Sequence, residues 1–356
     1  MHIVLVGLNH RTAPVGLRER VAFGPEQQEP GLVRLRRELG LPEALILSTC
    51  NRVEIYAGVP ELDGTLDRLA AFLGSHGRLG AEELHARLYR YSEPRSIEHL
   101  FSVVSGLDSM VIGETEILQQ VKQAYETARR HGATGKSLNV LFQKALNAGK
   151  AVHERTRLGQ GCLSVGTVAI ELAQKIFGSL ADRTVVLAGA GKVGELVIQR
   201  LAERGAGRQP VILNRSAERA QELAARYGGQ AFGLDALPAR LVEADVLITS
   251  ISSSQPLVTG QQMAAVMVER RQRPLCLVDL GVPRNIDPAA GQLDNVYLFD
   301  IDDLEGLVNH HAVQRQDAIR ESELIVRQKV GHFLSWWLRE HGPCPVPLSS
   351  ASAAVP

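Results

Sequence analysis

The fold of the second half of the chain is decided by the segment Thr184-Val185-Val186-Leu187-Ala188-Gly189-Ala190-Gly191-Lys192-Val193-Gly194. Its first five residues are β-branched or apolar, which predicts a short buried strand from Thr184 to Ala188. The glycines then follow the pattern G-x-G-x-x-G, and Glu195 to Glu203 is typical of a helix. Strand, glycine turn and helix in this order indicate a Rossmann βαβ unit.

Each glycine of this turn has a physical purpose in dinucleotide binding. The first makes the turn, the second lets the backbone approach a pyrophosphate, and the third lets the helix pack closely on the strand. The N-terminus of the helix adds a favourable field for negative charge. The predicted cofactor-binding residues of the turn are Gly189, Ala190, Gly191, Lys192, Val193 and Gly194.

The end of the next strand indicates which dinucleotide binds. An NAD site usually has an acidic residue there, which binds the ribose 2′-hydroxyl. This chain has Asn214, Arg215 and Ser216 instead, and an arginine with a serine suits a 2′-phosphate. We therefore expect NADPH. The alternative is that Arg215 faces solvent and that either cofactor binds.

The residues around this motif alternate between short apolar strands and amphipathic helices. Alternation of this kind predicts a parallel sheet with helices on both faces. The expected strands are Thr184 to Ala188, Pro210 to Leu213, Asp245 to Ile251, Leu275 to Leu280 and Val296 to Phe299.

A second informative stretch lies in the first half, Leu47-Ser48-Thr49-Cys50-Asn51-Arg52-Val53-Glu54-Ile55-Tyr56. Polar turn-forming residues separate two strand-like runs, which places the Cys50 thiol at the tip of a tight connection. A thiol beside an arginine that favours its thiolate is suited to nucleophilic attack. The alternative, a small buried core residue, has about equal weight on this block alone.

The first segment mixes further strands and helices. Ile3 to Leu8 is strand-like, and helices are expected over Glu116 to Arg130 and Leu138 to Arg155. Between helical patterns lies the polar, glycine-containing loop from Ser105 to Thr115. From about Asp302 to Leu338 a single long helix is expected, with an apolar seam formed by Ile319, Val326, Val330, Phe333 and Trp337.

Composition limits the class of protein. The 356 residues are 45% hydrophobic and 22% charged, which fits two or three globular domains. No apolar run approaches a membrane span, and the N-terminus lacks the basic lead-in of a signal peptide. The four cysteines form no C-x-x-C and lie far apart, so we expect a reducing cytoplasm, no disulfide framework and no metal site.

Charge gives one weak indication of a nucleic-acid partner. Lysine plus arginine and aspartate plus glutamate both number 39, so such a partner would need a local basic patch. The stretch from Lys122 to Arg157 has eight basic residues against Glu126 and Glu154. The solvated face of two helices explains it at least as well.

A cysteine nucleophile and a nicotinamide site in one chain suggest acyl chemistry. The thiolate would attack an activated acyl carbon to give a thioester, and a hydride would reduce that thioester to an aldehyde. The acyl donor must be an ester, a thioester or a phosphate, because a free carboxylate is too unreactive toward a thiol.

Four blocks resemble the glutamyl-tRNA reductase family: Gly7 to Pro14, Ser48 to Tyr56, Gly106 to Gln120 and Gly189 to Gly194. They have the family's order and spacing, and the resemblance extends from residue 1 to about Trp337. It implies NADPH-dependent conversion of glutamyl-tRNA(Glu) to glutamate-1-semialdehyde through a cysteine thioester. This is the first committed step of the five-carbon route to tetrapyrroles. A shikimate-dehydrogenase-type oxidoreductase and a non-catalytic tRNA-binding paralogue are the alternatives.

The resemblance also implies an α/β multidomain architecture. We expect an N-terminal α+β catalytic domain that binds glutamyl-tRNA over residues 1–157, and a Rossmann-type doubly wound NADPH domain over 158–302. A long helix over 303–341, linking the two, would be the remnant of a truncated dimerisation domain, with a disordered tail over 342–356. A monomer or weak dimer is therefore expected instead of the family's homodimer, with Trp336 and Trp337 exposed. Glutamate-1-semialdehyde aminomutase is the expected protein partner.

Site residues are carried over from the family position by position. Cys50 stands where the family has its nucleophile, and His99 matches a histidine required for activity, although an exposed helix histidine is the alternative. Arg52 is a suitable partner for the glutamate carboxylate, and Glu114 for the substrate's α-amino group. The other residues that match substrate-binding positions are Thr49, Asn51, Ser109, Thr115, Glu116 and Gln120.

Overall fold

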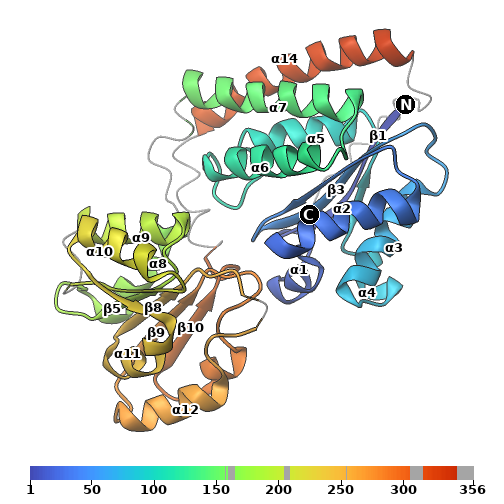
Figure 1. Ribbon diagram of the computed structural model, residues 1–356. Coiled ribbons are helices and arrows are strands. Elements are labelled where there is room, and N and C mark those ends of the chain that lie inside the picture. The colour runs from blue at the N-terminus through green and yellow to red at the C-terminus, as the bar shows by residue number, and fades with distance from the viewer. Residues whose placement is uncertain (157, 159–164, 204–208, 254, 305–315, 343–356) are drawn as a thin grey trace.

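The computed structural model describes residues 1–156, 158, 165–203, 209–253, 255–304 and 316–342. These residues form two α/β units and a long helix that packs on the first unit (Figure 1). The predicted boundary at residue 157 and nearly all of the predicted tail lie outside the described residues. Among the helices of these ranges, none has the length and apolar composition needed to cross a membrane.

The first unit is built on a four-stranded antiparallel sheet. Its strands are β1 (His2–Asn9), β2 (Glu43–Ser48), β3 (Arg52–Val59) and β4 (Tyr89–Tyr91), in the order β2-β3-β1-β4. Every residue of β3 is buried, so the sheet is covered on both faces. This explains why the charged residues of β3 must find partners inside the protein.

Helices form a layer on each side of this sheet (Figure 1). The helices below it in that view are α1 (Val15–Val21), α2 (Pro25–Leu39), α3 (Thr65–Gly77) and α4 (Ala81–His85). Those above it are α5 (Arg95–Val104), α6 (Glu116–Arg130) and α7 (Lys136–Arg155). The predicted bounds of α6 and the predicted helix at α7 agree with the structure. The loop between α5 and α6 lies near Cys50, because Arg52 at the start of β3 donates to the backbone oxygen of Asp108 in that loop.

The second unit is a six-stranded parallel sheet with the order β7-β6-β5-β8-β9-β10. The strands are β5 (Val185–Ala188), β6 (Val211–Asn214), β7 (Gln230–Gly233), β8 (Val246–Thr249), β9 (Leu275–Asp279) and β10 (Val296–Asp300). This is the Rossmann order, in which the chain reverses direction across the sheet between β5 and β8. The predicted doubly wound parallel fold is confirmed, although β7 was not among the predicted strands.

Two apolar clusters, one on each face, hold this sheet between its helices. One contains side chains of α8 (Val165–Phe177), α9 (Lys192–Glu203) and α10 (Ala217–Tyr227). The other contains side chains of α11 (Leu237–Glu243) and α12 (Gly260–Glu269). Two short 3-10 helices, η1 (Leu234–Ala236) and η2 (Pro288–Gln292), complete the unit.

The long C-terminal helix, α14 (Gln316–His341), packs across α7 and α5 of the first unit. The predicted seam is confirmed, because Val326, Val330 and Phe333 are buried in the core cluster of that unit. Trp337 is only 2% exposed and Trp336 is half-buried beside it, so the expectation that both tryptophans are exposed is wrong. Trp337 stacks on Phe333, the Trp336 ring packs against Phe333 at a tilt, and α14 lies on α7 and α5, which explains their burial.

The start of the long helix also differs from the prediction. Ile301 to Leu304 form a turn, and residues 305–315 lie outside the described residues. Asp302 is therefore part of this turn and not of a helix. Its carboxylate accepts hydrogen bonds from the backbone N–H of Val15 and from Arg18 in the first unit. The residue thus belongs to the junction between the two units.

Candidate functional site at the junction of the two units

Cys50 lies in the three-residue connection between β2 and β3, as predicted. Thr49 closes the connection, because its backbone N–H donates to Arg52 O and its Oγ1 accepts from the N–H groups of Asn51 and Arg52. Thr49 therefore shapes the turn that carries the thiol. Cys50 is partly exposed and packs against an apolar cluster that contains Val15, Met110 and Val111 of the first unit as well as side chains of the second unit. The thiol consequently faces the junction.

The arginine that influences the thiol is Arg18 of α1, which the sequence reasoning missed. Arg18 Nε donates to Cys50 O over 3.2 Å, and its positive charge favours the Cys50 thiolate. Arg52 was expected to have this effect. The structure instead buries Arg52 to 1% exposure, with its guanidinium bound to Glu54. That expectation is wrong because side chains alternate along a strand, so Arg52 and Glu54 point to the same face.

The electrostatic surroundings keep the resting thiol protonated. Burial, assisted by the negative charges of Glu114 and Glu116, raises the pKa of Cys50 to about 12, although the positive charge of Arg18 opposes this shift. Burial also raises the pKa of Glu114 to about 7, assisted by repulsion from Glu116. Any positive charge that neutralises Glu114 would therefore lower the Cys50 pKa and promote the thiolate.

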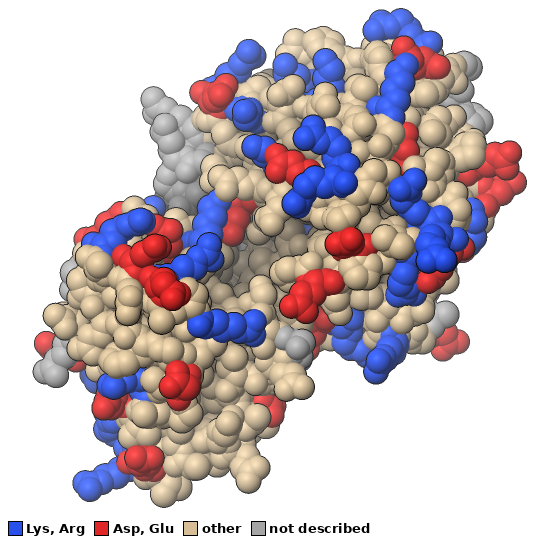
Figure 2. Space-filling model, viewed as in Figure 1, with Lys and Arg blue, Asp and Glu red and all other residues tan. Residues whose placement is uncertain are grey.

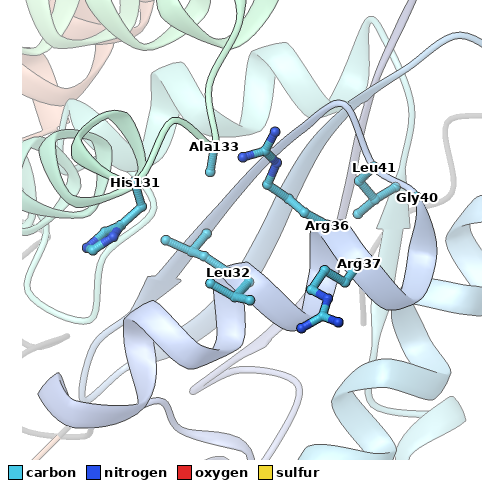
Figure 3. A pocket seen from close by; sticks show the side chains of 8 residues that line it. Leu32, Arg36, Arg37, Gly40, Leu41, His131 and Ala133 are labelled. Atoms are coloured by element: carbon cyan, nitrogen blue, oxygen red, sulfur yellow. The ribbon is translucent and has the colours of Figure 1, made fainter.

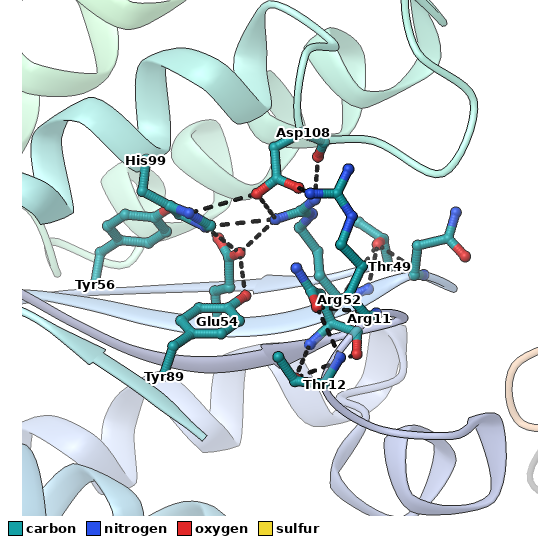
Figure 4. Close-up of polar contacts among 11 residues, drawn as sticks. Arg11, Thr12, Thr49, Arg52, Glu54, Tyr56, Tyr89, His99 and Asp108 are labelled. Carbon is teal, nitrogen blue, oxygen red and sulfur yellow. Dashed lines mark hydrogen bonds and ion pairs between the residues drawn. The ribbon is translucent and has the colours of Figure 1, made fainter. Parts of the chain in front are cut away.

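A buried polar cluster surrounds Glu54 at the centre of the first unit (Figure 4). Its Oε1 accepts from Arg52 Nη1 at 2.6 Å and from Tyr89 Oη at 2.6 Å, and it lies 2.8 Å from His99 Nε2. Its Oε2 accepts from Tyr56 Oη at 2.7 Å. Burial opposes ionisation of Glu54, but His99 and Arg52 together hold its pKa well below the usual range.

Asp108 joins this cluster to the loop that precedes α6. Its carboxylate lies 3.5 Å from His99 Nδ1 and 3.7 Å from Arg52 Nη1, and its backbone oxygen accepts from Arg52 Nη2. The loop closes where the N–H of Gly113 donates to Gly106 O. Gly113 has φ +87°, and a Cβ there would lie 2.3 Å from Leu158 O, so only glycine fits.

A recess opens beside His99 on the surface of the first unit. It is a space that a substrate could enter next to the imidazole. Its lining residues come from β4, α5, the loop before α6 and α14: Tyr91, Arg95, Glu98, His99, Ser102, Leu107, Asp108 and Glu323.

Two predicted substrate-binding residues have buried polar atoms with no partner among the described residues. These are Asn51 Oδ1 and Ser109 Oγ, and both residues are less than a tenth exposed. Buried polar atoms are nearly always hydrogen-bonded, so these two are suited to a ligand. Thr115 and Glu116 lie at the start of α6, and Gln120 lies one turn further on. Within the described ranges, no side-chain hydrogen bond joins Thr115 or Gln120 to the other predicted site residues.

The nucleotide turn has the geometry that its glycines predict. Gly189 has φ +119°, and a Cβ at Gly194 would lie 2.0 Å from Gly189 O. A Cβ at Gly191 would meet nothing within 4 Å, so the backbone there is open to a ligand. Ala190 N–H donates to Asn214 Oδ1 at 3.2 Å, which ties the turn to the end of β6.

The residues expected to determine the preference between NADPH and NADH lie at the same edge of the sheet. Arg215 is exposed and forms no ion pair with any residue in the described part of the chain. Ser216 caps α10 by accepting from Arg219 N–H, and its Oγ donates to Glu218. Lys192 donates to Gln119 of α6, so the glycine turn touches the first unit directly. Val193 packs against the apolar cluster under the turn.

Charged side chains border a hollow between the two units (Figure 2). Part of the basic stretch from Lys122 onward is already paired: Lys122 with Glu126 at 3.7 Å and Lys136 with Glu340. A separate pocket between α2 and the end of α6 contains Arg36, Arg37 and His131 (Figure 3). It lies at the opposite end of β2 from Cys50, and its arginines occupy the last turn of α2, where they complement the helix dipole.

Comparison with known protein families matches each unit separately. Residues 6–156 match the family model for the N-terminal domain of glutamyl-tRNAGlu reductase. Residues 171–307 match the model for shikimate / quinate 5-dehydrogenase.

Comparison with whole proteins extends the likeness over nearly the full chain. The glutamyl-tRNA reductase of Bacillus subtilis is 41% identical over 336 residues, which cover 94% of this chain and 74% of that protein. The one of Rubrobacter xylanophilus is 42% identical over 336 residues, covering 94% and 78%. The solved structure of glutamyl-tRNA reductase from Methanopyrus kandleri superposes with a TM-score of 0.51 and 32% identity, covering 95% of this chain and 81% of that one.

Proposed function

The chain belongs to the glutamyl-tRNA reductase family, and we propose that it reduces glutamyl-tRNA with Cys50 as the nucleophile. The observation that supports this assignment is the position of the thiol. It lies on a hydrogen-bonded turn of the first unit and packs against an apolar cluster to which both units contribute. A thioester formed there faces the unit that would supply the reductant.

The first half of the reaction is transfer of the glutamyl group to sulfur. The thiolate sulfur bonds to the ester carbonyl carbon, the bond to the tRNA 3′-terminal ribose oxygen breaks, and that oxygen leaves with a proton. The resting thiol has a pKa of about 12, so the substrate must help to ionise it. The ammonium group of the glutamyl moiety can do this by pairing with Glu114 and cancelling its negative charge.

Recognition of the glutamyl group uses the buried polar atoms that have no partner among the described residues. Asn51 Oδ1 and Ser109 Oγ are available beside the nucleophile turn and the loop before α6. Arg52 contacts both Glu54 and the backbone of Asp108, so we assign it to holding the turn, the His99 ring and the loop in register. Binding of the substrate carboxylate by Arg52 stays a prediction.

The second half of the reaction needs NADPH, and the residues at the glycine turn fit it. Gly191 leaves its backbone open, Asn214 fixes the N–H of Ala190, and Arg215 is unpaired among the described residues and can bind a 2′-phosphate. When bound, NADPH supplies a hydride that adds to the thioester carbon, so that the carbon–sulfur bond breaks and the aldehyde and thiol are released.

A single-turnover assay with labelled glutamyl-tRNA tests this proposal. Without NADPH, label should accumulate on the protein, and with NADPH it should appear as glutamate-1-semialdehyde. Cys50→Ser should abolish both. Cys276→Ser is the matched control, because Cys276 is buried inside the second sheet and should leave both rates unchanged. Persistent protein labelling in Cys50→Ser would refute the assignment.

The proposal also includes a cellular location and a protein partner. The substrate is an aminoacyl-tRNA, so the chain acts in the cytoplasm, where thiols stay reduced. The aldehyde product is reactive, which favours its direct transfer to glutamate-1-semialdehyde aminomutase. A pull-down of that aminomutase at micromolar concentration, with and without substrate, would check the second point.

A further inference from the structure

A single buried arginine connects the nucleophile turn with both units. Arg18 of α1 is 0% exposed, and each part of its guanidinium has a partner. Its Nε donates to Cys50 O at 3.2 Å, its Nη1 to Ala13 O at 2.9 Å, and its Nη2 to Asp302 Oδ1 at 2.8 Å. Of these three partners, Asp302 comes from the second unit, since it lies two residues after the end of β10.

The second oxygen of the Asp302 carboxylate also accepts a hydrogen bond from the first unit. Its Oδ2 accepts from the N–H of Val15, the first residue of α1, at 2.8 Å. One carboxylate thus binds both the start of α1 and an arginine one turn further along it. The side chain of Asp302 is 28% exposed, so it can be changed with less risk to folding than Arg18.

A second ion pair crosses the same junction without touching the nucleophile turn. Glu19, the neighbour of Arg18, accepts from Arg284 Nη2 at 2.8 Å and Nε at 3.1 Å, and from the Arg284 backbone N–H at 3.0 Å. These contacts also hold the units together. Comparing the Arg18–Asp302 pair with the Arg284–Glu19 pair therefore distinguishes a loss of contact between the units from a specific effect on Cys50.

We infer that Arg18 is a positioning residue that transmits the placement of the second unit to the Cys50 turn, with Asp302 as the contact that sets it. A guanidinium is a planar fork with fixed donor directions, so three simultaneous acceptors determine where its Nε lies. The hydrogen bond from that Nε fixes the position of the Cys50 carbonyl, and the thiol of the same residue is thereby positioned as well.

The consequence for catalysis differs between the two half-reactions. Transfer of the glutamyl group to Cys50 uses residues of the first unit, whereas reduction of the thioester requires both units in register. An error of about 1 Å in such an alignment can cost about a hundredfold in rate. This inference rests on the proposed function, because it takes Cys50 as the acylated residue.

The test compares Asp302→Ala with Glu19→Ala in the full-length chain. Each substitution removes one carboxylate from the junction. In Asp302→Ala we expect kcat for NADPH-dependent reduction to fall by about tenfold or more, with the KM for NADPH and the NADPH-free acylation rate nearly unchanged. Glu19→Ala should retain kcat to within about threefold. Asp302→Asn, which keeps one acceptor oxygen, should give an intermediate kcat.

Three outcomes would overturn the inference. The first is an equal loss of kcat in both alanine variants, which would show general weakening of the junction. The second is unchanged reduction in Asp302→Ala. The third is a loss expressed only in the KM for NADPH. Failure of the proposed function is distinguishable, because it would appear as continued acylation of Cys50→Ser whatever the behaviour of the Asp302 variants.

Discussion

Glu54 Oε1 lies 2.8 Å from His99 Nε2, so a fully buried carboxylate fixes the imidazole from beneath. Asp108 approaches the other ring nitrogen at 3.5 Å. The ring is therefore held between two carboxylates, one inside the core and one on the loop before α6. This arrangement directs His99 toward the recess described above, and its stability depends on Glu54 keeping its charge.

Removal of that charge should destabilise the first unit. Glu54→Gln leaves Arg52 buried without its closest anionic partner, for which we expect a loss of about 3 kcal/mol in the free energy of unfolding. Urea denaturation measures this directly. Tyr89→Phe removes one hydrogen bond from the same carboxylate and should cost only about 1 kcal/mol. Similar losses in the two variants would contradict an essential role for the charge.

The charge of Glu114 should control the reactivity of Cys50. Glu114 raises the pKa of the thiol, so Glu114→Gln should lower that pKa and increase the thiolate fraction at pH 8. Alkylation of Cys50 by iodoacetamide, followed by peptide mass mapping, should become several-fold faster. Glu98→Gln provides a control, since Glu98 is not among the groups that shift the thiol. Slower alkylation in Glu114→Gln would contradict the electrostatic account.

The same carboxyl group gives a pH-dependent effect on stability. Its pKa in the folded protein is raised from 4.5 to about 7, so its contribution to stability is present below pH 4.5 and lost as the pH rises through 7. Glu114→Gln should therefore be more stable than the parent at pH 8, and this gain should shrink toward pH 5. Thermal unfolding across this pH range checks the sign. A gain that grows as the pH falls would refute it.

The open backbone at Gly191 should matter for the cofactor and not for the fold. Gly191→Ala places a methyl group where no atom of the described residues, apart from its own chain neighbours, lies within 4 Å, so folding should be unaffected. The methyl group would occupy the path of the pyrophosphate, and NADPH binding should weaken by about tenfold or more. Fluorescence titration measures this. Gly331→Ala, equally free of contacts but in α14, should bind NADPH as the parent does.

Arg215 should determine the preference for NADPH over NADH. Arg215→Ala removes the only unpaired cation at the end of β6 among the described residues, and the ratio of kcat/KM values for the two cofactors should fall by about tenfold. Arg219→Ala, an exposed arginine on the following helix, should leave the ratio unchanged. Equal use of NADPH and NADH by the parent would contradict the assignment.

Much of the nucleotide-binding unit could be predicted from the sequence, because its signals are local. The strand, the glycine turn and the helix are adjacent in the chain, and the alternation of elements indicated a parallel sheet. Strand β7 was missed since Gln230 to Gly233 is short, partly exposed and lacks an apolar run. Its pairing with β6 comes from the sheet, not from its own composition.

The candidate site was less predictable, because its contacts join residues that lie far apart in the chain. The Arg52 and Glu54 pair could have been found, since two charges at alternate positions of an apolar strand share a face. Asp108 and Arg18 could not, because their partners depend on how the loop before α6 and the two units pack. The contact between Arg18 and Asp302 spans 284 positions and has no sequence pattern.

The protonated state of the resting Cys50 thiol has a consequence for how easily the protein is oxidised or alkylated. Oxidants such as peroxide and most electrophilic drugs react with thiolates, so an idle molecule with this thiol protonated is a poor target for both. Reactivity would appear once a cationic amino group sits near Glu114. A covalent inhibitor should therefore carry a primary amine beside its electrophile. The amine would promote formation of the Cys50 thiolate, which would then attack the electrophile.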